Sequence, residues 1–108
     1  MRDLYQVRQR EQAITLEVRN AVHQLEQAKL SVAAARIARD LAQKNLQAEQ
    51  RKYEIGAETI FFVLDAQTQL AQAEQSLVQA QIDYQRALVA VDRATGQLLV
   101  KHNVELAP

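Results

Sequence analysis

Two long helical patterns are separated by one short stretch, Tyr53-Glu-Ile-Gly-Ala-Glu-Thr-Ile-Phe-Phe-Val-Leu-Asp-Ala66. It contains Gly56, the only glycine before residue 96, and no proline or glycine interrupts residues 2–55. Ala, Gln, Leu, Glu and Arg are abundant on both sides, a composition that is typical of long helices rather than of a compact globule. The sequence therefore predicts an all-α fold, a long antiparallel two-helix coiled-coil hairpin that turns at this stretch.

The glycines and the apolar pattern also set the expected boundaries of a single hairpin over residues 1–108. Its predicted parts are a helix at about 2–55, a tip at 56–61, a second helix at about 62–95 and a tail at 96–108. The helix stop is placed at Thr95-Gly96 because glycine readily adopts a left-handed cap. Within the tail, residues 98–100 and 104–106 are expected to form short extended pieces, or to be disordered or paired with a neighbouring molecule.

A seven-residue repeat of apolar side chains predicts the seam along which the two helices pack. In the first helix its two columns are Leu4, Glu11, Val18, Leu25, Val32, Arg39, Leu46, Tyr53 and Val7, Ile14, Ala21, Ala28, Ala35, Ala42, Glu49. In the second helix they are Val63, Leu70, Leu77, Tyr84, Val91, Leu98 and Ala66, Ala73, Ala80, Ala87, Ala94. The all-alanine column lets the helix axes approach closely. Glu11, Arg39 and Glu49 interrupt the otherwise apolar seam.

Each helix carries a further apolar stripe beside the seam. These flanking stripes comprise Leu16, Leu30 and Ile37 on the first helix and Leu64, Ala71, Val78, Ile82 and Val89 on the second. They predict that each helix contacts more than its hairpin mate.

Charge divides the chain in two although the net charge is zero. Residues 1–53 hold ten Lys/Arg and six Asp/Glu, a balance of +4, whereas residues 54–108 hold three and seven, a balance of −4. Opposite charges favour pairing of the two arms, and no dense basic block indicates nucleic-acid binding.

No apolar run is long enough for a transmembrane helix. Residues 1–6 do not resemble a signal peptide, so we expect a cytoplasmic chain or a piece of an exported protein.

The sequence lacks the patterns of a catalytic or metal centre. His23 and Glu26 lie one helical turn apart, but a metal site needs further ligands, and His102 is distant along the chain. Ser31 and Ser76 have no histidine one turn away to act as a base, and no glycine-rich loop is present to hold phosphate. We therefore expect no enzyme activity, no metal and no cofactor.

The turn and the second helix resemble a known family over roughly residues 46–99. The residues that carry the resemblance are Arg51-Lys-Tyr53-Glu-Ile-Gly56, Val63-Leu-Asp-Ala66, Leu70, Ala73-Glu74, Leu77, Ala80, Asp83-Tyr84, Ala87 and Arg93-Ala-Thr-Gly96. Together they are similar to the last helical hairpin of TolC-family outer membrane efflux proteins. The Tyr-x-x-Gly followed by Leu-Asp-Ala is the specific part, whereas the Ala/Leu repeat alone is not.

The resemblance implies a trimeric outer membrane efflux or type I secretion channel with an α-helical tunnel barrel in the periplasm. Each subunit of such a channel has two tandem repeats, and this chain resembles only the second repeat's hairpin. It lacks barrel strands and the first repeat, so it is expected to be a fragment whose segment lies in the periplasm. The implied partners are a periplasmic adaptor, two further subunits of the homotrimer and, indirectly, an inner membrane transporter.

The resemblance also implies roles for residues at the tip. Ile55, Gly56 and Ala57 correspond to the contact with the adaptor, although Gly56 also suits a turn on its own account. Asp65 matches an acidic position of the closed tunnel entrance. Phe62 stands where a second acid is common in the family. In place of a double acidic ring, we expect Phe61 and Phe62 either to close the entrance by apolar packing or to face a neighbouring subunit.

Simpler roles and other proteins fit the same residues. Asp65 is equally well explained as a first-turn acid that favours the positive helix N-terminus, and Thr59 suits an N-cap.

A periplasmic adaptor's own hairpin also has glycine near its tip, but Gly56-Ala57 is followed here by Glu58-Thr59 rather than by the adaptor pattern Gly-Ala-x-Ser. A freestanding coiled-coil scaffold is the remaining alternative.

Overall fold

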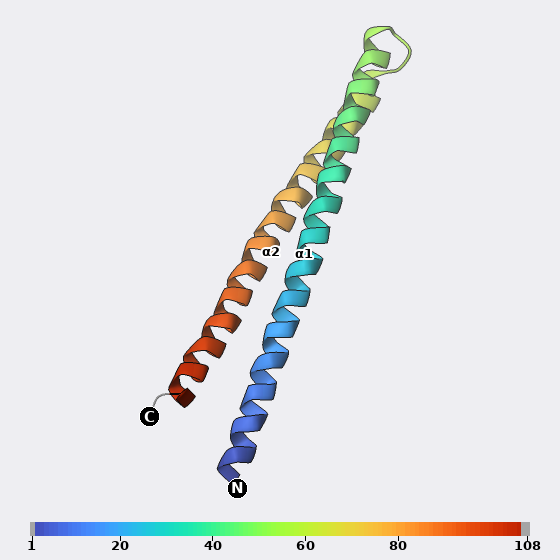
Figure 1. Ribbon diagram of the computed structural model, residues 1–108. Helices are drawn as coiled ribbons and strands as arrows, with labels where there is room; N and C mark the ends of the chain where they lie inside the picture. Colours follow the sequence, from blue (N-terminus) through green and yellow to red (C-terminus); the bar gives the residue numbers. More distant parts are fainter. Residues whose placement is uncertain (1, 107–108) are drawn as a thin grey trace. The chain divides into compact units, whose positions relative to one another are not determined.

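The computed structural model describes residues 2–106 and contains two helices joined by a short turn (Figure 1). Helix α1 spans Arg2–Glu54 and helix α2 spans Ile60–Leu106. No strand occurs among the residues that the structure describes. The predicted all-α helical hairpin is confirmed.

The contacts along the chain fall into two compact units, and both helices run through both units. The tip unit is Lys29–Asp83, in which the second half of α1 lies antiparallel to the first half of α2. The open-end unit combines Met1–Ala28 with Tyr84–Pro108. The turn, and therefore the candidate site, belongs to the tip unit.

The core of the tip unit is the predicted seam. Val63, Ala66 and Leu77 are buried, and Ala66 is only 2% exposed. The half-buried residues of this unit that belong to the seam are Val32, Ala35, Arg39, Ala42, Leu46, Glu49, Leu70, Ala73 and Ala80. Small side chains therefore lie where the two helices meet, as the alanine column predicts. The two polar interruptions, Arg39 and Glu49, also face the seam.

The open-end unit continues the same repeat with fewer buried side chains. Ile14 and Ala21 are buried. Further seam positions are half-buried: Val18, Leu25, Ala28, Tyr84, Ala87, Val91 and Ala94. Leu4 and Val7, which the repeat places in the seam, are exposed. The seam therefore weakens toward the beginning of α1.

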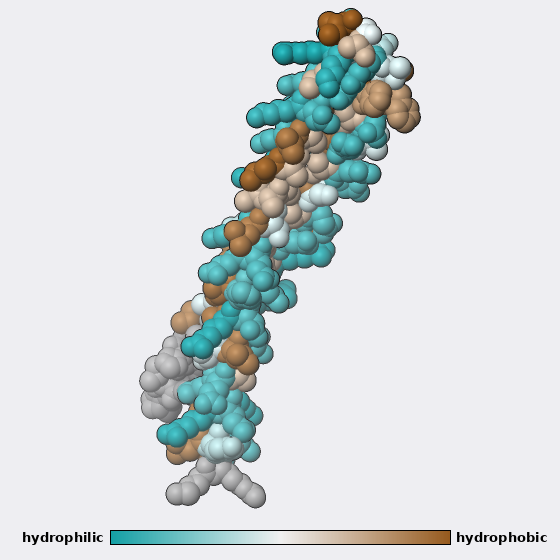
Figure 2. Space-filling view, turned by 90° about the vertical axis from the view of Figure 1, so that its right-hand side faces the viewer, coloured by the Kyte–Doolittle hydropathy of each residue, from teal (hydrophilic) through white to brown (hydrophobic). Residues whose placement is uncertain are grey.

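The flanking stripes are uncovered. Their large members are exposed on both helices, for example Leu30 at 72% and Ile37 at 70% on α1. Val78, at 54%, is exposed on α2. Figure 2 shows such apolar side chains as brown areas between the teal polar ones. The expected additional neighbours of each helix remain a prediction.

The boundaries of α2 differ from those expected. The helix begins at Ile60, two residues earlier than predicted, and continues through Gly96 to Leu106 instead of stopping at residue 95. The predicted stop was wrong because glycine permits a left-handed cap but does not impose one, and among the described residues only Gly56 has a positive φ. The segments 98–100 and 104–106 are helical, not extended, and the last two residues of the predicted tail lie outside the described residues.

Candidate docking site at the helix-to-helix turn

The turn closes α1 with a regular C-cap centred on Gly56. The backbone N–H of Ala57 donates to the carbonyl of Lys52 at 2.8 Å, and the N–H of Gly56 donates to the carbonyl of Tyr53 at 3.0 Å. This pair of bonds is the Schellman arrangement, which requires a left-handed residue at the position after the cap. Gly56 supplies it with a φ of 75°. The glycine is therefore needed for the turn itself.

Helix α2 begins directly after Thr59, the position at which the sequence predicts its N-cap. The carbonyl of Thr59 accepts a hydrogen bond from the N–H of Phe62 at 3.3 Å, which forms the first tight turn of the helix. Only residues 55–59 lie between the two helices. Because backbone hydrogen bonds fix both ends of this short segment, its backbone has a defined conformation.

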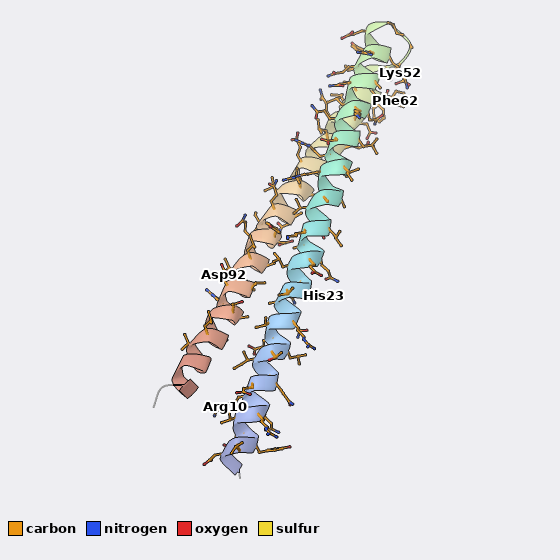
Figure 3. All side chains as sticks on the ribbon, viewed as in Figure 1. Arg10, His23, Lys52, Phe62 and Asp92 are labelled. Atoms are coloured by element: carbon orange, nitrogen blue, oxygen red, sulfur yellow. The ribbon has the colours of Figure 1, made fainter. Side chains whose placement is uncertain are left out.

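The turn exposes large apolar side chains. Ile55 is 79% exposed, Phe61 is 69% exposed and Phe62 is 48% exposed, while Gly56 and Ala57 are also open to solvent. The rings of Phe61 and Phe62 meet edge to face, with centroids 6.1 Å apart. Figure 3 shows Phe62 near the start of α2, at the end of the tip unit that carries the turn. Exposed apolar groups of this size on an ordered turn are typical of an interaction site.

Asp65 lies on an exposed face of α2, one turn beyond Phe62. Its Oδ2 accepts a hydrogen bond from Nε2 of Gln69 at 3.2 Å. Because α2 begins at Ile60, Asp65 is in the second turn, and the first turn contains no acidic residue. The explanation of Asp65 as a first-turn acid was therefore wrong, since a helix dipole acts mainly within the first turn.

Glu49, Lys52 and Glu58 form a charged cluster at the turn that the sequence patterns did not predict. Lys52 Nζ lies 3.7 Å from Glu49 Oε1 and 3.6 Å from Glu58 Oε1, so one ammonium group links α1 with the loop. Hydrogen bonding of a protonated carboxyl group to Glu58, followed by burial, raises the pKa of Glu49 above its ordinary value, while Lys52 lowers it. The signal for this cluster in the sequence is Glu49, an acid at a seam position.

The described residues of the turn hold no cluster of metal-ligating side chains. Within the described residues, no group of three or more His, Cys, Asp or Glu side chains lies close enough to hold a metal ion. His23, exposed on α1 in the open-end unit, has its Nε2 3.2 Å from Nε2 of Gln27. The searched part of the chain also has no helix that meets the length and apolarity needed to cross a bilayer.

The outer membrane efflux protein family matches residues 2–97 of this chain. The chain belongs to that family. The match covers nearly all of the described residues, including the part of α1 before residue 46, to which the resemblance in the sequence did not extend. No curated protein and no solved structure matches the chain.

Membership of the outer membrane efflux protein family confirms the resemblance to TolC-like channels and decides against an adaptor hairpin or a freestanding scaffold. The family is one of transport channels and not of enzymes. Its members form trimers with a periplasmic tunnel and work with adaptor proteins. The hairpin therefore belongs to the helical tunnel part of an outer membrane efflux channel.

Proposed function

We propose that this hairpin is a periplasmic tunnel hairpin of an efflux channel and that its turn docks a periplasmic adaptor. The observation that supports this proposal best is the exposure of Ile55. This residue is large and apolar, yet 79% of its surface is open to solvent. An apolar side chain that projects from a turn between two helices is well placed to enter a pocket of a partner.

The geometry of the turn supports this docking role. The Schellman bonds at Gly56 and Ala57 order the loop before any partner arrives, so little conformational entropy is lost on binding. Gly56 has no side chain, and a Cβ built there meets no atom within 4 Å, so a partner's backbone can approach the turn closely. Ile55 then acts as the anchor, with Gly56 and Ala57 as the surface beside it.

We further propose that Phe62 and Asp65 belong to the tunnel entrance of the assembled trimer. The two residues are three positions apart on α2 and therefore lie on neighbouring positions of one helical face. Phe62 offers exposed apolar surface and Asp65 an exposed carboxylate, so three subunits would bring an apolar ring and a single acidic ring together. The chain would thus reside in the periplasm as part of an outer membrane protein.

Binding of the full 108-residue chain to a periplasmic adaptor tests the docking role. Ile55→Glu places a charge on the proposed anchor without altering either helix. Ile37→Glu is the matched control, because Ile37 is also an exposed isoleucine of the tip unit, at 70%, but lies on α1. We expect Ile55→Glu to weaken binding by at least about tenfold, as expected for a hot-spot residue, and Ile37→Glu to bind as the parent does. Equal binding by all three chains would contradict the proposal.

The entrance role has a separate test. Asp65→Asn removes the carboxylate and retains the shape of the side chain, and its measurement is the ion conductance of the trimeric channel in a planar bilayer. We expect cation selectivity to fall, because the ring of negative charge is lost. Asp83→Asn is the control, since Asp83 is an exposed acid of the same helix further from the turn. An identical loss of selectivity in both variants would contradict the assignment.

A further inference from the structure

Three charged side chains join the end of α1 to the loop that follows it. Glu49 faces the seam, Lys52 lies one turn further along α1, and Glu58 belongs to the loop. The ammonium group of Lys52 is 3.7 Å from Glu49 Oε1 and 3.6 Å from Glu58 Oε1. One positive charge is thus shared by two carboxyl groups that come from different parts of the turn.

The second oxygen of each carboxyl group lacks a donor. Glu49 Oε2 and Glu58 Oε2 are both shielded from solvent, and neither finds a hydrogen-bond partner within the described part of the chain. Two ionised carboxylates only accept hydrogen bonds, so they cannot satisfy each other. A single proton on either group changes this, because it supplies one O–H donor for a short, charge-assisted bond to the other.

We propose that Glu49 and Glu58 share one proton, with Lys52 as their counter-ion. We call the contact of these three side chains the clasp, and it holds the loop to α1 more firmly as the pH falls. The clasp lies beside the turn's own hydrogen bonds, because Lys52 also provides the carbonyl that Ala57 bonds. Glu58 is the residue directly after Ala57, so holding its side chain restrains the C-cap as well.

The charges around Glu49 support this direction. Hydrogen bonding to Glu58, which needs a proton on one of the two carboxyl groups, raises the pKa of Glu49 above its ordinary value of 4.5, as do desolvation and the negative charge of Glu58, whereas Lys52 lowers it. On α1, Tyr53 is the other titratable residue one turn away. On α2, Asp65 is the only charged residue before Glu74, and it is exposed and bonded to Gln69.

The sign of the effect follows from the raised pKa. A carboxyl group that binds its proton more tightly in the folded state stabilises that state when it is protonated. The stabilisation of the folded loop by the clasp is therefore fully present below the ordinary pKa of a glutamate. It is lost as the pH rises through the raised pKa of Glu49. Above that pH, two negative charges face one positive charge and the loop is held less firmly.

Nuclear magnetic resonance on the whole 108-residue chain tests the clasp without any partner. The side-chain carboxyl carbons of Glu49 and Glu58 are followed between pH 4 and pH 8. Exchange protection of the Ala57 amide, corrected for the intrinsic rate, is measured over the same range. We expect the two carboxyl groups to titrate as one coupled pair, and protection to rise on the order of two- to fivefold on acidification, as fits a partly exposed ionic contact.

Two variants distinguish a shared proton from a general effect of pH. Glu58→Gln provides a permanent N–H donor in place of the proton, so the pH dependence of Ala57 protection should disappear while the loop stays closed. Glu54→Gln removes an exposed carboxylate at the end of α1 and should leave the dependence unchanged. Independent titration of Glu49 and Glu58, or a pH dependence that survives in Glu58→Gln, would overturn the proposal.

A consequence for docking rests on the function proposed above. If the loop of Ile55, Gly56 and Ala57 receives an adaptor, a clasp that orders the loop should make docking tighter in mildly acidic solution. Because the resonance experiment contains no adaptor, a failure of the clasp and a failure of the docking role are observed separately.

Discussion

Replacing Ala66 with leucine tests the close packing of the seam. Ala66 is 2% exposed, and its neighbour Val63, one turn before it, is 5% exposed, so the surroundings have no room for three further carbon atoms. Overpacking of a closely packed site costs about 1–3 kcal/mol, since either side chains or helix axes must shift. A cost of about 2 kcal/mol lowers the melting temperature of a domain of this size by roughly 8–16 °C.

Thermal unfolding followed by circular dichroism at a fixed chain concentration measures this change. Ala71→Leu is the matched control, because Ala71 lies in the same helix and the same unit but is exposed. Alanine and leucine have similar helix propensities, so the control is expected to alter stability by less than about 0.5 kcal/mol. Equal melting temperatures for Ala66→Leu and the parent would refute the claim that small residues set the distance between the helices.

The two glycines and the charged cluster give three further predictions. Gly56→Ala should destabilise the chain by about 1–2 kcal/mol, because alanine is strained at a φ of 75°; an undiminished unfolding temperature would contradict this. Gly96→Ala should stabilise it by about 0.5–1 kcal/mol in chemical denaturation, since Gly96 lies inside α2 with open space for a Cβ, and a loss of stability would indicate a left-handed cap after all. Lys52→Met should raise the pKa of Glu49 further, because Lys52 favours its ionised form, and a lowered value on carboxyl titration would exclude the ion pair.

The hairpin and its seam were predictable because both depend on local, repetitive signals. The seven-residue repeat located the buried positions on both helices, and the isolated Gly56 located the turn. The helix stop predicted at Gly96 was wrong, because α2 continues through this residue. A glycine near the end of an apolar pattern has the same sequence signature whether it caps the helix or lies within it, and the neighbouring helix formers decide the outcome.

The exposed apolar residues of the turn were found by resemblance, whereas the charged cluster needed three-dimensional structure. Glu49 was visible as a polar residue in an apolar seam, but its partner Glu58 lies beyond the turn. Only the path of the loop brings Glu58 to Lys52. The position of Asp65 relative to the helix N-terminus likewise depended on where α2 begins, a boundary that sequence patterns place only within a few residues.

The docking role of the turn is tested most directly by site-specific cross-linking. The chain contains no cysteine, so Ala57→Cys introduces a unique attachment point for a photoactivatable maleimide reagent at the proposed contact. Ala38→Cys, at an exposed position of α1 in the same unit, is the control. With a periplasmic adaptor present, we expect a cross-linked product from the Ala57→Cys variant and little from Ala38→Cys. No product from Ala57→Cys, or equal products from both variants, would contradict it.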